Sequence, residues 1–125
     1  MIKIRIDNIL FLQEIIYEKT GGDKGIRDEN LLDLSLKSCY QTFEKKELFP
    51  SIEEKAAKLC ISIISNHVFT DGNKRIGLLA MLTFLEINSV NLEFTDNEII
   101  NIGLKIASGN MNYDTLLGII REHKN

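Results

Sequence analysis

Apolar residues recur at helical spacing along most of the chain and predict five or six α-helices. An apolar residue that returns every three or four positions places one face of a helix against a core. The segments with this pattern cover residues 7–20, 28–40, 51–66, 73–88, 95–108 and 113–123. Residues 2–6 and 90–94 instead alternate apolar and polar positions, so each is a candidate strand, or in the first case an ordered lead-in. We therefore expect an all-α fold, a compact bundle with at most a short strand.

Start signals at several segments support these helices. Asp7 and Asp28 have the side chain of a helix N-cap, and Ser51–Glu54 and Thr95–Glu98 have the form of capping boxes. The third and fourth helical segments are apolar on more than one face, which predicts that they are the central helices of the bundle. No repeat, linker or low-complexity run divides the sequence, so a single domain over residues 1–125 is expected.

Composition and charge exclude several classes of protein. The formal net charge is −3, whereas a protein that binds duplex nucleic acid usually has a basic face, so direct nucleic-acid binding is disfavoured, a helix-turn-helix DNA binder included. No stretch approaches the roughly 18 apolar residues that would cross a bilayer, and the N-terminal residues lack the apolar core of a signal peptide. Cys39 and Cys60 lie in helical patterns without metal-ligand spacing, as expected of reduced buried thiols. The protein is expected to be cytoplasmic, without a membrane partner.

One polar segment, residues 67–75, lies between the two central helices and reads His-Val-Phe-Thr-Asp-Gly-Asn-Lys-Arg. It brings an imidazole, a carboxylate, an amide and two cationic groups together where the second of these helices begins. Free backbone N–H groups and the positive end of the helix dipole attract anions at such a position. Lys74 and Arg75 add positive charge to an end that is already positive, so an anion is expected to complete the site.

A phosphate chain is the natural anion, with Lys74 and Arg75 as its clamp. Asp71 would then be the carboxylate available to Mg²⁺, which usually takes one or two carboxylates together with phosphate oxygens. Gly72 would allow the backbone to approach the ligand closely. His67 would be the group that deprotonates an incoming hydroxyl near neutral pH, because histidine is the side chain most often used as a general base.

Each of these residues also has an ordinary interpretation. A lone histidine at a helix end is more often a structural hydrogen-bonding group, Asp71 followed by glycine is also a turn signal, and adjacent Lys and Arg are normally a solvated pair. His67 and Asp71 alone do not make a zinc site, because no third ligand is near and His123 belongs to an end expected to fray. Phe69 is expected to point into the core and anchor the segment.

The segment H-V-F-T-D-G-N-K-R resembles the Doc version of the Fic/Doc superfamily signature, H-x-F-x-D/N-G/A-N-K-R. The resemblance extends to G-G-x-x-G-I-R-D-x-N-L-L at 21–32, and to E-K-A-A and F-L-E-I-N on the two sides of the motif. It implies the all-helical Fic bundle, with the motif joining its central helices and Phe69 packed beneath. His67 would be the general base for a target hydroxyl and Asp71 the Mg²⁺ ligand. The ATP phosphates would be held by Asn73, Lys74 and Arg75.

Two positions depart from the pattern of Fic proteins that transfer AMP, H-x-F-x-D/E-G-N-G-R-x-x-R. Lys74 replaces its second glycine and Leu78 its last arginine. The lysine puts a side chain where bare backbone would cradle a phosphate, and the loss of the arginine removes a phosphate clamp. In Doc-type proteins the nucleotide is turned round and its γ-phosphate is transferred, so the resemblance implies an ATP-dependent protein kinase.

The same resemblance implies a toxin of a toxin–antitoxin pair that inhibits translation, with a threonine of elongation factor Tu as the leading target. The self-inhibitory Fic signature S/T-x-x-x-E-G/N is not found in this sequence, so restraint would come from a separate antitoxin protein. Two alternatives stay open: a Fic-type AMP transferase and a non-enzymatic helical interaction module. Residues 90–94 would be the flap that aligns the target beside the motif, and the loop at 21–28 has no assigned role.

Overall fold

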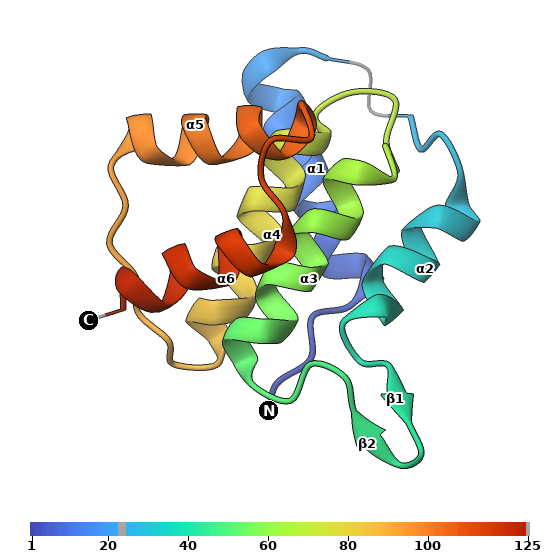
Figure 1. The fold of residues 1–125 in the computed structure, drawn as a ribbon. Helices are drawn as coiled ribbons and strands as arrows, with labels where there is room; N and C mark the ends of the chain where they lie inside the picture. The colour runs from blue at the N-terminus through green and yellow to red at the C-terminus, as the bar shows by residue number, and fades with distance from the viewer. Residues whose placement is uncertain (23–24, 125) are drawn as a thin grey trace.

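The structure, a computed structural model, describes residues 1–22 and 25–124. In this part of the chain six α-helices follow one another (Figure 1). Their bounds are α1 (Ile6–Thr20), α2 (Glu29–Ser38), α3 (Ile52–Ser65), α4 (Asn73–Ile87), α5 (Asp96–Ala107) and α6 (Tyr113–Glu122). An antiparallel pair of two-residue strands, β1 (Thr42–Phe43) and β2 (Lys46–Glu47), lies between α2 and α3. The all-α prediction is therefore confirmed.

The prediction that α3 and α4 are the central helices is also confirmed. Figure 1 shows them side by side in the middle of the bundle with the other helices around them. They pack tightly at Gly77, where a Cβ atom would lie only 2.7 Å from Cγ1 of Ile64 and 3.3 Å from the carbonyl oxygen of Cys60. Only glycine fits there without a shift of the Ile64 side chain or of one helix. None of the described helices has both the length and the apolar character needed to cross a membrane.

The predicted start signals act as expected, with one exception. Asp28 accepts hydrogen bonds from the N–H groups at the start of α2, and both predicted capping boxes are formed. The exception is Asp7, which lies in the first turn of α1 and does not cap it. Arg5 is the N-cap, because the side chain of Asn8 reaches back and accepts a hydrogen bond from the N–H of Arg5 at 2.9 Å.

Neither alternating stretch forms a strand. Residues 2–5 are a lead-in held to the end of α4, where the amide side chain of Asn88 bonds the N–H and the carbonyl of Ile2 at 2.7 and 2.9 Å. The strands form instead at 42–43 and 46–47, where the sequence indicated only a break. The turn between them places Glu44 and Lys45 at φ 50° and 67°. A two-residue hairpin turn needs this left-handed backbone, but it usually has Asn or Gly there, so the hairpin had no sequence signal.

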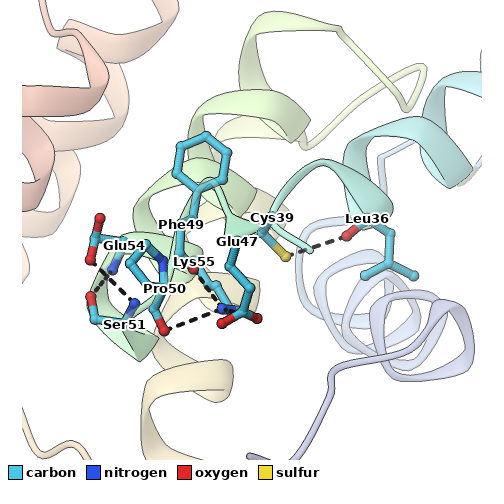
Figure 2. Close-up of polar contacts among 8 residues, drawn as sticks. All are labelled: Leu36, Cys39, Glu47, Phe49, Pro50, Ser51, Glu54 and Lys55. Carbon is cyan, nitrogen blue, oxygen red and sulfur yellow. Dashed lines mark hydrogen bonds and ion pairs between the residues drawn. The ribbon is translucent and has the colours of Figure 1, made fainter. Parts of the chain in front are cut away.

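A buried lysine joins this hairpin to the core (Figure 2). Lys55 of α3 is only 1% exposed, and its Nζ donates to the carbonyl oxygens of Phe49 and Pro50 at 2.5 and 3.4 Å. The same Nζ lies 3.0 Å from a carboxylate oxygen of Glu47 on β2. A lysine ammonium is buried only when such partners satisfy it, so these contacts fix the segment that leads into α3.

Candidate active site

The segment between α3 and α4 lies at one end of the bundle (Figure 1). It borders a cavity of about 520 Å³. All six residues predicted to form the site line this one cavity: His67, Asp71, Gly72, Asn73, Lys74 and Arg75. Its walls are completed by the end of α1 and Gly22, by Ile64 of α3 and by Ala107 of α5. A volume of this order is typical of small-molecule sites.

The start of α4 is suited to an anion. Its N-cap is Gly72, at φ 82°, and no side chain among the described residues accepts a hydrogen bond from the first turn. Each of the other described helices has an acidic residue in its first turn, whereas α4 has none there and has Lys74 and Arg75 instead. The positive end of this dipole is therefore reinforced by the chain, which favours a bound phosphate.

Asp71 offers one carboxylate at the edge of the cavity. One of its oxygens, Oδ1, accepts a hydrogen bond from the N–H of Gly72 at 2.8 Å. The other, Oδ2, faces Gly22, where any added Cβ atom would overlap it. The described residues contain no cluster of three or more histidine, cysteine or acidic side chains able to hold a metal by themselves. A single carboxylate would suit Mg²⁺ that is shared with phosphate oxygens, and Asp71 stays the predicted ligand.

The side chain of Asn73 is used within the loop. Its Oδ1 accepts from the N–H of Phe69 and its Nδ2 donates to the carbonyl of Phe69, both at 2.8 Å. Phe69 itself is 1% exposed and packs into the core, as predicted. The Nδ2 group has a second N–H, which these two bonds do not use. The Asn73 side chain therefore shapes the loop, and its second N–H stays a predicted donor to a phosphate.

The sequence did not predict that residues 25–27 pair with the motif. Residues 26 and 69 form an antiparallel bridge, in which the N–H of Arg27 donates to Val68 at 2.9 Å and the N–H of Thr70 donates to Gly25 at 3.0 Å. The resemblance included this stretch as G-I-R-D, but it gave the stretch no role. Residues 23 and 24 of the same loop lie outside the described residues.

The flap assigned to residues 90–94 is wrongly placed. These residues follow the far end of α4, which is roughly 22 Å long, and none of them lines the cavity. Leu92 forms a bridge with Lys124 instead, and the ring of Phe94 stacks on His123. The pairing beside the motif is made by residues 25–27.

His123 is held in place and is not part of a frayed end. Its Nε2 lies 2.7 Å from Oε2 of Glu98, and its Nδ1 lies 2.8 Å from the carbonyl oxygen of Ile119. The hydrogen bond to Glu98 is the main cause that raises the pKa of His123 above its usual value. His123 does not line the cavity beside the motif, so it is not a candidate for the site.

Comparison with known proteins agrees with this geometry. Residues 3–85, which contain the whole motif, match the model of the Fic/DOC family. The chain belongs to the Fic/DOC family. It is also 40% identical over 72 residues to the Toxin Doc of Mycolicibacterium smegmatis (strain ATCC 700084 / mc(2)155), a match that covers 58% of this chain and 55% of that protein. The chain thus matches about half the length of this curated relative.

Within this Fic/DOC site, the two positions that depart from the AMP-transfer pattern lie on one side of α4. Lys74 lines the cavity, whereas Leu78, one turn later, is 5% exposed and packs against Gly103 of α5. Leu78 also lines an apolar groove of about 480 Å³ that extends from Lys74 along α4 and α5. The position that would hold the last arginine is therefore part of an apolar wall.

The two cysteines take no part in the site. Both thiols are free and buried, as the sequence predicted, and neither lines the cavity. Burial is the main cause that raises the pKa of Cys39 to about 11 and that of Cys60 to about 12. Thiols with such pKa values are protonated at neutral pH and are poor nucleophiles.

Proposed function

We propose that this Fic/DOC protein is a toxin that acts as a protein kinase, transferring the γ-phosphate of ATP to a hydroxyl of a protein target. The observation that carries this proposal is the pair Lys74 and Leu78. Lys74 lines the cavity, and Leu78 leaves an apolar wall where an AMP transferase would have its arginine. Without that clamp, the pose that presents the α-phosphate loses a partner, which favours transfer of the γ-phosphate.

In this mechanism the chain supplies positioning and charge, as phosphoryl transfer requires. The bond between the target oxygen and the γ-phosphorus forms, the bond from that phosphorus to the β-phosphate bridging oxygen breaks, and ADP leaves. His67 accepts the hydroxyl proton, while Lys74, Arg75 and the first N–H groups of α4 stabilise negative charge. Asp71 would hold Mg²⁺, which when bound would neutralise phosphate charge.

The toxin part of the proposal is supported by the name of the relative, Toxin Doc, and by the family itself. Its leading target is elongation factor Tu, modified on a threonine, which would stop translation. A cognate antitoxin protein would restrain it. The groove beside Leu78 supports such a partner, because its apolar floor ends at Lys74 and Arg75 and so suits an apolar segment with a carboxylate at one end.

The first test uses purified protein, Mg²⁺ and a cell extract, with ATP labelled on the γ- or the α-phosphate. Transfer of γ-label alone, lost in His67→Ala and kept in His123→Ala, is the expected result, and the mass of the labelled protein gives the target. The second variant is a matched control, because the sequence has only these two histidines. Removal of a general base should lower kcat by about 10²- to 10⁴-fold. Expression of the wild-type chain alone should stop growth, and His67→Ala should not.

Other results would separate the alternatives. Transfer of α-label would make the protein an AMP transferase, and the argument from Lys74 and Leu78 would be wrong. Transfer of neither label, together with normal growth on expression, would favour a non-enzymatic interaction module.

A further inference from the structure

The backbone of His67 is left-handed at a position, directly after a helix C-cap, where this conformation is common but is usually taken by glycine. His67 follows the C-cap of α3 and has φ 48°, in the left-handed region that residues other than glycine rarely adopt. Such a backbone persists only where its surroundings hold it, and it often marks a functional position. Because His67 lines the cavity, whatever holds this backbone also sets where the imidazole points.

Arg27 makes the contacts that hold it. Its Nε donates to the carbonyl oxygen of His67 and its Nη2 donates to that of Asn66, each at 2.7 Å. These two carbonyls lie at the negative end of α3, where a cation is favoured, and hydrogen bonds from a charged donor are the strong ones. The backbone N–H of Arg27 donates to Val68 at 2.9 Å. One residue thus bonds three successive carbonyls around His67.

The other end of this contact is also fixed. Asp28, the next residue, caps α2, so Arg27 cannot shift without moving the start of that helix. The amide of Asn66 donates to the hydroxyl of Ser35 in α2 at 2.9 Å, and Ser35 is 1% exposed. The backbone before the motif is therefore held from both sides, by the guanidinium and by a buried hydroxyl.

We infer that Arg27 is a positioning residue for His67. It does not line the cavity, so it acts on the reaction only through the backbone that it bonds. The planar guanidinium reaches two carbonyls at once, whereas a lysine ammonium is a single point of charge. This role rests on the proposed function of His67 as the general base.

The main test compares Arg27→Met with Arg5→Met. Arg5 is a matched control, because it is also exposed beside a helix end, and its Nε and Nη2 both donate to the carboxylate of Asp7, at 3.3 and 3.1 Å. Within the described part of the chain Arg5 makes no hydrogen bond with the motif, and it does not line the cavity. A misplacement of about 1 Å costs on the order of 10²-fold in rate. Arg27→Met should therefore lower kcat for γ-phosphate transfer about 10- to 100-fold, with KM for ATP changed less than about 3-fold. Arg27→Lys should recover part of the loss, and Arg5→Met should match the wild type.

A second readout does not depend on catalysis. The sequence has two histidines, so the ¹H–¹³C NMR spectrum has one ring Cε1–H signal for each. In Arg27→Met the His67 signal should shift or broaden while that of His123 stays in place, and in Arg5→Met neither should move. If Arg27→Met does not fold, Arg27→Lys provides the same comparison.

The inference is overturned if Arg27→Met keeps its kcat within about 2-fold of wild type, or if the His67 signal does not move. It is also overturned if kcat falls only in proportion to a loss of folded protein measured by circular dichroism. Should the wild-type chain transfer no phosphate at all, the proposed function fails. The NMR comparison then still decides whether Arg27 positions His67.

Discussion

The role of Asp71 is best tested through Gly22, which has no reactive group of its own. Gly22 lies outside the left-handed region, so alanine is compatible with its backbone. The added methyl group would overlap Oδ2 of Asp71 and lie 3.2 Å from its Cγ. Because Asp71 is exposed, its carboxylate can rotate away from the methyl group. Gly22→Ala should thus displace the proposed Mg²⁺ ligand and leave the fold in place.

The expected size of the effect follows from this geometry. Relief of the overlap requires the carboxylate to move by about 1 Å, and a displacement of that size at a reacting site costs on the order of 10²-fold in rate. This corresponds to about 2.7 kcal/mol in the activation free energy. The free energy of unfolding should change by less than about 1 kcal/mol, because an exposed side chain absorbs the change.

The assay measures kcat for γ-phosphate transfer at several Mg²⁺ concentrations, together with the thermal unfolding midpoint. Gly22→Ala should lose activity most at low Mg²⁺ and recover part of it at high Mg²⁺. Gly118→Ala is the matched control, because a Cβ atom at Gly118 of α6 would meet nothing within 4 Å. It should keep full activity and gain about 0.5–1 kcal/mol of stability, as alanine does in place of glycine within a helix.

Two results would refute this reasoning. If Gly22→Ala keeps more than about half of the wild-type rate at low Mg²⁺, the position of the Asp71 carboxylate does not matter to the reaction. If it loses activity only as far as it loses folded protein, the displaced carboxylate causes no loss of its own, and the predicted effect of Gly22→Ala on Asp71 is wrong.

Two further predictions concern stability. Lys55→Met keeps the buried stem but removes a charged donor from two carbonyls. It should lower the free energy of unfolding by about 2 kcal/mol and the thermal unfolding midpoint by roughly 8 °C. Glu47→Gln, at a half-exposed partner, should lower the free energy of unfolding by less than about 1 kcal/mol, as measured by urea unfolding. Equal losses would show that the ion pair, and not the carbonyl contacts, carries the energy. The second prediction concerns the pair His123 and Glu98. Because the pKa of His123 is raised in the folded state, His123 adds to the free energy of unfolding below about pH 6.5, and this contribution is lost as the pH rises through the raised pKa. The pKa of Glu98 is lowered, first by the hydrogen bond from the Thr95 N–H, so Glu98 contributes above about pH 4.5. Stability from this pair should therefore be greatest between these values, and Glu98→Gln should return the NMR-measured pKa of His123 toward 6.5; an unchanged pKa would contradict the assignment.

The parts of the structure that the sequence predicted depend on contacts within a few residues. The capping box Ser51–Glu54 closes within one turn, and its two hydrogen bonds are formed at 3.1 and 3.2 Å. The grouping of the six proposed site residues was also predictable, because all of them belong to the single stretch 67–75, and they line one cavity. Periodicity and short-range chemistry were sufficient for both.

The parts that it did not predict depend on contacts between distant residues. Arg27 and His67 are 40 positions apart. Nothing in the local sequence predicts that an arginine in a polar loop will bond two carbonyls at the end of α3. Lys55 lies in an apolar pattern where a lysine would be expected to reach solvent. Its burial depends on the carbonyls of Phe49 and Pro50 and on the carboxylate of Glu47. The hairpin before it has a left-handed turn without glycine or asparagine.

The side chains proposed to react, His67, Asp71, Lys74 and Arg75, are all exposed, whereas Val68, Phe69 and Ile76 between and beside them are buried. Substitution of a reacting side chain should therefore cost activity with little loss of stability, and substitution of a buried neighbour should cost both. Arg27 differs from both groups, since it is exposed like the first but supports the backbone like the second. Substitution of Arg27 should therefore give a protein that keeps its fold and binds ATP normally but reacts slowly. Substitution of a buried residue of the loop should not give this result.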